Sequence, residues 1–193
     1  GVCIDIDGVL CNLERTWIDF LCSKNIDFRP ISSLDFSGHL YDHERKRYDA
    51  LKSEFRESGI KKDAYLFEGA KEFLHCLKEK YKIVLVSARP VTKHHRIYAD
   101  TIEWLKKNEL FYDVLVFEDN KRSWALKNIE KIAFFVEDNF EQAVKLCGVG
   151  LKVYLMLHEY NLCFRHKDIK RVANFKEILK NENIFNISHP TAA

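Results

Sequence analysis

Val2-Cys3-Ile4-Asp5-Ile6-Asp7-Gly8-Val9-Leu10, at the beginning of the chain, is the stretch that decides the fold. Val2 to Ile4 is an apolar run typical of a buried strand, and Gly8 favours a turn after it. Asp5 and Asp7 then both lie in the connecting loop, where they can converge on one metal ion and one phosphoryl group. The alternative is a solvated turn that ends a strand with turn-favouring residues. We expect phosphoryl transfer through an aspartyl intermediate.

Composition limits the class of protein. The chain has 193 residues, of which 47% are hydrophobic, enough for one compact domain with a modest insertion. Lys and Arg number 31 against 29 Asp and Glu, so the net charge of +2 does not predict a nucleic-acid partner. No apolar run approaches the ~18 residues of a membrane span, and nothing resembles a signal peptide. We expect a cytoplasmic protein.

The cysteines and the short first strand allow two further predictions. Six cysteines occur without Cys-x-x-Cys spacing, several of them in apolar runs, and are expected to be reduced. The first strand has only three residues before Asp5, whereas strands average ~5 residues. We therefore expect that a few residues upstream of this strand are missing or belong to an expression scar.

Short β-rich runs alternate with amphipathic helical stretches along the chain, which predicts a parallel sheet flanked by helices. The predicted strands are Val2 to Ile4, Lys82 to Val86, Val114 to Phe117, Ile132 to Val136 and Leu151 to Leu155. Apolar residues recur at helical spacing between them, as in Phe73, Leu77 and Tyr81. The predicted fold is α/β, a Rossmann-like open parallel sheet of about five strands.

Polar residues follow four of these strands. Ligands of such sheets bind at the carboxyl ends of the strands, where this chain places Asp5 and Asp7, then Ser87-Ala88-Arg89-Pro90, Glu118-Asp119-Asn120-Lys121 and Glu137-Asp138-Asn139. Four strand ends that supply carboxylates, a hydroxyl and an ammonium are unusual in a merely structural sheet. This shared placement favours a catalytic role over a solvated turn.

At these positions the chain resembles the haloacid dehalogenase superfamily of phosphohydrolases. Asp5, Asp7, Ser87, Lys121 and Asp138 match its motifs residue by residue. The resemblance implies that Asp5 is the nucleophile. It implies that Asp7 is the general acid and base, a role suited to a carboxyl group held partly neutral. Ser87 and Lys121 would then hold the transferring phosphoryl group. For each residue alone, a strand-end hydroxyl or a solvated surface cation is the competing interpretation.

An oxygen-only metal site is expected, and Mg²⁺ is the ion that such a site prefers. The predicted ligands are Asp5, Asp7 (through its carbonyl, as in the family), Asp138 and, beside it, Glu137. The family usually has Asp or Gly where Glu137 stands, so Asp138 is the preferred ligand of that pair. Gly8, Ala88 and Arg89 are the residues expected to bind substrate.

The tripeptide Glu-Asp-Asn occurs twice, at 118–120 and 137–139, each time after an apolar strand. The second copy fits the acidic motif better, because suitable lysines precede it. Lys121 and Lys127 are both candidates for the phosphate-binding lysine. Lys121 is preferred because it stands at the start of a helix near a strand end, with Lys127 expected to be buried later in that helix.

The alternation of strands and helices breaks off between Leu13 and Phe67. The superfamily places a small helical cap here, which predicts a core of residues 1–12 and 68–193 and a cap of residues 13–67. Asp42 to Ser58 is expected to be a charged helix that Gly59 ends. The aromatic residues of this segment could line a substrate pocket or simply form the core of the cap; they are Trp17, Phe20, Phe36, Tyr41, Tyr65 and Phe67. His39 or Arg45 could reach a sugar or phosphate of the substrate.

Several segments narrow the resemblance to the deoxyribonucleotidase-type branch and its uncharacterised nucleotidase relatives. They are Val84 to Pro90, Thr101 to Leu105, Tyr112-Asp113 and, more loosely, Val153 to Met156, Tyr160-Asn161 and Arg171 to Asn174. The expected function is Mg²⁺-dependent hydrolysis of a nucleoside monophosphate, with oligomeric state open. A phosphatase for another small metabolite or a nucleic-acid 3′ phosphate, and a catalytically weak phosphate-binding regulatory protein, are the alternatives.

Overall fold

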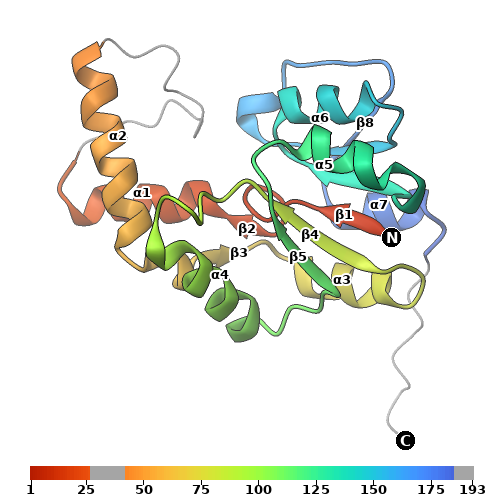
Figure 1. The fold of residues 1–193 in the computed structure, drawn as a ribbon, viewed down its shortest axis with the longest axis horizontal. Coiled ribbons are helices and arrows are strands. Elements are labelled where there is room, and N and C mark those ends of the chain that lie inside the picture. The colour runs from red at the N-terminus through yellow and green to blue at the C-terminus, as the bar shows by residue number, and fades with distance from the viewer. Residues whose placement is uncertain (27–41, 185–193) are drawn as a thin grey trace, which may run out of the picture.

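A computed structural model describes residues 1–26 and 42–184 of the chain. Its centre is a sheet of six parallel strands in the order β5-β4-β1-β6-β7-β8 (Figure 1). These strands are β1 Val2–Ile4, β4 Ile83–Ser87, β5 Val114–Phe117, β6 Phe134–Glu137, β7 Val153–Met156 and β8 Ile169–Val172. The chain runs outward from β1 to β5 on one side and then from β6 to β8 on the other. The strand order therefore reverses beside β1, where open α/β sheets bind ligands.

The predicted Rossmann-like α/β fold is confirmed, with one correction. The sheet has six strands rather than about five, because β8 (Ile169–Val172) pairs with β7 at the edge. Three of the five predicted strands begin one or two residues later than expected. The strands β4, β6 and β7 each extend one residue further, so that Ser87 and Glu137 are the last residues of their strands.

Helices cover both faces of the sheet because alternate strand residues point to opposite sides. Val2 and Ile4 face one hydrophobic core, and Cys3 between them faces the other. The first core receives α3 and α7, and the second receives α5 and α6. The helices are α1 Leu13–Ser23, α2 Asp42–Glu57, α3 Ala70–Lys78, α4 His95–Lys107, α5 Lys121–Asn128, α6 Phe140–Cys147 and α7 Phe175–Asn181, with 3₁₀ turns η2 Ile60–Asp63, η3 Ile129–Lys131 and η4 Glu159–Asn161.

A short second sheet marks where the chain leaves and re-enters this core. The strands β2 (Cys11–Asn12) and β3 (Tyr65–Leu66) pair antiparallel, with Cys11 opposite Leu66. Between them lie α1, α2 and η2, to one side of the main sheet in Figure 1. The helix predicted from Asp42 ends at Glu57, and Gly59 follows with a φ of 81°, a conformation that favours glycine.

The aromatic residues of the 13–67 segment divide between its interior and its surface. Trp17 and Phe20 are buried and pack against Phe55, so they form a local core rather than an open wall. Tyr65 is exposed and donates a hydrogen bond to Asp19. Phe67 is half-buried and Arg45 is exposed. The candidates Phe36, His39 and Tyr41 lie outside the described residues.

Two observations bear on the predictions from composition. All six cysteines are free. Among residues 1–26 and 42–184, none of the helices has the length and apolar character that crossing a membrane requires.

Candidate functional site

The loop after β1 is held by backbone contacts that fix both of its carboxylates. The Asp5 amide donates to the Val136 carbonyl of β6 at 3.0 Å, and the Ile6 amide donates to Asp5 Oδ1 at 2.8 Å. Gly8 has a φ of 76°, which closes the turn and lets its amide reach the Cys11 carbonyl at 2.9 Å. The sheet and the turn therefore place Asp5 and Asp7 at the carboxyl edge of β1.

Lys121 joins Asp5 to the acidic residue that ends β6. Its Nζ lies 2.8 Å from Asp5 Oδ2 and 2.8 Å from Glu137 Oε2. All three side chains are buried. Lys121 is the first residue of α5, which Asn120 caps through its side chain, whereas Lys127 is exposed in the last turn. Lys121 is therefore the lysine at this site, and the expectation that Lys127 is buried is wrong.

The side chains of Asp5, Glu137 and Asp138 could hold a cation. One carboxylate oxygen from each lies within 4.8 Å of the others. Burial raises the pKa of Asp5 to about 8, although Lys121 opposes this shift. Burial, and then the charge of Asp5, raise the pKa of Asp138 to about 7. Crowded, buried carboxylates that resist ionisation are what a divalent cation with oxygen ligands relieves.

Residues 158–161, which follow β7, hold Asp138 in place through hydrogen bonds. The Tyr160 hydroxyl donates to Asp138 Oδ2, and the Asn161 side chain donates to the Asp138 carbonyl and to the Met156 carbonyl, each at 2.8 Å. His158 Nε2 lies 2.6 Å from the Gly8 carbonyl. This segment therefore contacts both the loop after β1 and the loop after β6.

Asp7 forms a separate ion-paired group with Arg89 and Lys61. Arg89 Nη2 donates to Asp7 Oδ1 at 2.6 Å and Nε donates to Oδ2 at 3.0 Å, while Lys61 Nζ lies 3.7 Å from Oδ2. Burial alone would raise the pKa of Asp7, but Arg89 and Lys61 outweigh it and hold that pKa far below its usual range. The expectation of a partly neutral carboxyl at Asp7 is therefore wrong while Arg89 is paired with it.

Lys61 is itself a buried cation. Burial lowers its pKa to about 8, opposed by Asp7 and assisted by the charges of Arg89 and Arg56.

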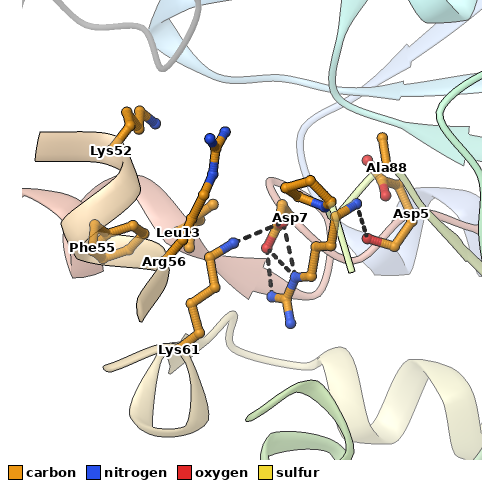
Figure 2. Close-up of a pocket in the computed structure, with 11 residues that line it drawn as sticks. Asp5, Asp7, Leu13, Lys52, Phe55, Arg56, Lys61 and Ala88 are labelled. Carbon is orange, nitrogen blue, oxygen red and sulfur yellow. Dashed lines mark hydrogen bonds and ion pairs between the residues drawn. The ribbon is translucent and has the colours of Figure 1, made fainter. Parts of the chain in front are cut away.

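Asp5, Asp7, Arg89 and Lys61 line one cavity (Figure 2). The core lines it with Asp5, Asp7, Ser87, Ala88, Arg89 and Pro90. The 13–67 segment contributes Leu13, Lys52, Phe55, Arg56 and Lys61. Ser87 is fully buried, and its Oγ accepts from the Arg89 amide at 3.3 Å.

Thr101 on α4 holds the guanidinium of Arg89 in place. Arg89 Nη1 donates to Thr101 Oγ1 at 2.9 Å, and the hydroxyl donates in turn to the Ile97 carbonyl at 2.6 Å. Because Thr101 is fully buried, Thr101→Val leaves a buried charged donor without a partner. We expect urea unfolding to show a loss of roughly 1–3 kcal/mol. Thr101→Ser keeps the hydroxyl and should lose clearly less; equal losses would contradict this role for the hydrogen bond.

With this geometry in place, comparison with known proteins gives the family. The sequence profile of the family described as "5′ nucleotidase, deoxy (Pyrimidine), cytosolic type C protein" matches residues 2–184. The chain belongs to this nucleotidase family. Nucleotidase CA_C3379 of Clostridium acetobutylicum is 25% identical over 183 residues, covering 92% of this chain and 91% of that protein. YqfW of Bacillus subtilis, whose name assigns it provisionally to the nucleotidases, is 26% identical over 182 residues, covering 92% of this chain and 90% of that protein.

Solved structures of the haloacid dehalogenase fold resemble this nucleotidase-family chain throughout. The haloacid dehalogenase-like hydrolase SP0104 of Streptococcus pneumoniae superposes with a TM-score of 0.65 at 12% identity, covering 94% of this chain and 97% of that chain. YfnB of Bacillus subtilis, provisionally assigned to the HAD hydrolases and solved with bound magnesium, superposes with a TM-score of 0.64 at 14% identity, covering 95% of this chain and 98% of that chain. The family and the fold together make the protein a phosphohydrolase of the nucleotidase type.

The structure brings the site residues predicted for this nucleotidase-family chain to one edge of the sheet. Lys121 is in direct contact with Asp5 and with Glu137. Asp138 lies against them and against Gly8, where an added Cβ would be 2.0 Å from Asp138 Oδ2. Sequence reasoning missed Lys61, Phe55 and Arg56 from the 13–67 segment, as well as Tyr160 as a partner of Asp138. Tyr160 lay within a segment noted only for its resemblance to nucleotidases.

Proposed function

We propose that the protein is a Mg²⁺-dependent nucleotidase that hydrolyses the phosphomonoester of nucleoside monophosphates through an aspartyl phosphate on Asp5. The observation that carries this proposal is the contact of Lys121 with Asp5 and Glu137, next to the oxygen of Asp138. A buried carboxylate in contact with an ammonium and facing a cavity suits a nucleophile for phosphorus. Membership of the nucleotidase family supports the nucleotide as substrate.

In this mechanism an Asp5 oxygen attacks phosphorus in line, and the bond between phosphorus and the leaving oxygen breaks. Lys121 and the Ser87 hydroxyl hold the equatorial oxygens, with Gly8, Ala88 and Arg89 around the substrate. Asp7 gives a proton to the leaving oxygen. It then takes a proton from the water that hydrolyses the aspartyl phosphate, which releases inorganic phosphate and restores Asp5. Asp7 can give its proton only after its carboxyl separates from Arg89, because the ion pair keeps it charged.

Asp5, Asp138 and Glu137, with the carbonyl of Asp7, are the residues that would hold Mg²⁺. The three carboxylates fit this ion because they supply only oxygen ligands and their pKa values are raised by burial and crowding. When bound, Mg²⁺ neutralises charge on the carboxylates and on the phosphoryl oxygens. Glu137 is the weaker candidate, since Lys121 already occupies Oε2 and the Asn139 amide donates to Oε1 at 3.2 Å.

We further propose that residues 13–67 act as a cap on a core of residues 1–12 and 68–193. Support comes from Leu13, Phe55 and Lys61, which line the same cavity as Asp5 and Asp7. A cap in this position excludes water from the site and contacts the leaving group, so it selects the substrate.

Beryllium trifluoride tests the assignment of the nucleophile, because BeF₃⁻ mimics a phosphoryl group on a carboxylate. We expect a ¹⁹F NMR signal of bound BeF₃⁻ only when Mg²⁺ is present, and none with Asp5→Asn. In parallel, phosphate release from nucleoside monophosphates should require Mg²⁺ and stop when EDTA is added. Binding of BeF₃⁻ to Asp5→Asn, or hydrolysis that continues in EDTA, would contradict the proposal.

A further inference from the structure

The cavity at the candidate site carries more positive than negative side chains. Its carboxylates are Asp5 and Asp7, while four cations line it, namely Lys52, Arg56, Lys61 and Arg89. Lys61 is only 4% exposed and Arg89 only 3%. A buried cation costs free energy unless an anion lies close to it. The described part of the cavity therefore has a surplus of positive charge.

Asp7 does not account for this surplus. Arg89 already binds both of its carboxylate oxygens, with Nη2 at 2.6 Å from Oδ1 and Nε at 3.0 Å from Oδ2. Lys61 Nζ stays 3.7 Å from Oδ2, beyond hydrogen-bond distance. The ammonium of Lys61 thus gains attraction from Asp7 but no hydrogen bond, and its donors are available to a ligand.

The three cations of the 13–67 segment, Lys52, Arg56 and Lys61, lie on the side of Asp7 away from Asp5. Figure 2 shows Lys61 reaching Asp7 from the 13–67 segment, with Asp5 on the opposite side of Asp7. Lys121 serves the Asp5 side. In an in-line transfer the leaving group departs opposite the attacking oxygen. With Asp5 as the nucleophile, the cations of the 13–67 segment therefore line the space that the leaving group occupies.

Two of these cations, Lys52 and Arg56, belong to α2, and they differ in whether the side chain is free to bind a ligand. Lys52 and Arg56 are one helical turn apart, so they share a face of α2. The Lys52 ammonium lies 4.7 Å from the centre of the Trp17 ring, which holds it on an aromatic face. Within residues 1–26 and 42–184, no ion pair or hydrogen bond of the Arg56 side chain is found. Arg56 is thus the better partner for a ligand.

We propose that Lys61, Arg56 and Arg89 form a subsite for a second anionic group on the leaving group. The preferred substrate is then a nucleotide that carries a second phosphate, a nucleoside bisphosphate. This inference rests on the proposed function, because it assumes that a phosphoryl group is transferred to Asp5. A nucleoside without a second phosphate offers no charge to Lys61 and Arg56. A second phosphate also competes with Asp7 for Arg89, which separates the Asp7 carboxyl from its partner.

The test compares initial rates of phosphate release from 5′-monophosphates and 3′,5′-bisphosphates of the four common ribonucleosides. Mg²⁺ is kept saturating and ionic strength constant. We expect kcat/KM to be at least tenfold higher for the bisphosphate of the best nucleoside. Lys61→Met and Arg56→Gln should each lower this ratio at least threefold. Arg56 is half-buried, so its variant remains informative if Lys61→Met does not fold.

Lys62→Met is the matched control. Lys62 is the next residue of η2, but it pairs with Glu103 at 3.6 Å and does not line the cavity. Its variant should keep the wild-type ratio. A wild-type ratio near one with active monophosphate hydrolysis overturns the subsite and leaves the proposed function standing. A high ratio that neither Lys61→Met nor Arg56→Gln lowers also overturns the subsite. If neither the monophosphates nor the bisphosphates are hydrolysed, the proposed function itself is wrong.

Discussion

Asp5→Asn is expected to lower Mg²⁺-dependent hydrolysis of p-nitrophenyl phosphate by roughly a thousandfold or more, about 4 kcal/mol of transition-state stabilisation. An amide cannot form the aspartyl phosphate. Lys121 Nζ and the Ile6 amide contact different oxygens of Asp5, so the single amide oxygen of Asn can accept from only one of them. Burial disfavours the charge of Asp5, and its removal offsets the lost contact, so the variant should unfold near the wild-type temperature. Thermal unfolding measured beside the rate separates chemistry from stability.

Asp119→Asn is the control for this change. Asp119 is the acidic residue of the first Glu-Asp-Asn copy, and it is exposed after β5. Its variant should hydrolyse the aryl phosphate at the wild-type rate. If Asp5→Asn and wild type released phosphate equally fast, the assignment of the nucleophile would be wrong.

Gly8→Ala is expected to lower turnover at least a hundredfold, about 2.7 kcal/mol, and to destabilise the fold by roughly 1–3 kcal/mol. A Cβ at Gly8 would lie 2.0 Å from Asp138 Oδ2 and 2.3 Å from its Cγ. Asp138 would have to turn away from Asp5 and from the Tyr160 hydroxyl that now holds it. Phosphate release and urea unfolding measure the two effects.

Gly150→Ala separates the clash from backbone strain. Gly150 has a φ of 91°, comparable to the 76° of Gly8, but a Cβ there would meet no atom within 4 Å. We expect this variant to lose roughly 1–2 kcal/mol of stability through its left-handed backbone and to keep its activity. Equal losses of activity in the two variants would show that contact with Asp138 is not the cause.

The strands that sequence predicted are largely apolar runs, including β5 at one edge of the sheet, whose residues are all apolar although half-buried. Phe134, Phe135 and Val136 form such a continuous apolar run in β6. The edge strand β8 was not predicted, because the charged residues Lys170 and Arg171 separate its two apolar residues, Ile169 and Val172. A strand with one neighbour tolerates charged side chains toward solvent, so its sequence does not differ from that of a loop.

The candidate site divides in the same way. Asp5, Ser87 and Asp138 were predictable because each stands beside the end of an apolar strand, and parallel strands bring their ends together. Lys61 was not predictable, because it stands beside Lys62 shortly after Gly59 and nothing in the local sequence distinguishes the two lysines. Packing of η2 against α4 and α2 buries one and leaves the other partly exposed. The pairing of Asp7 with Arg89 likewise depends on distance in space, across 82 positions of the chain.

The pairing of β2 with β3 has a consequence for how recognition can diverge. Cys11 lies opposite Leu66 and Asn12 opposite Tyr65, so the chain departs and returns at neighbouring backbone positions. Changes of length between these positions leave the register of the six-stranded sheet untouched. Exchange of this excursion replaces the walls supplied by Leu13, Phe55 and Lys61 while the strand ends stay as they are. With residues 13–67 as the proposed cap, a different segment inserted here would change which substrate is selected and leave the proposed catalytic residues in place.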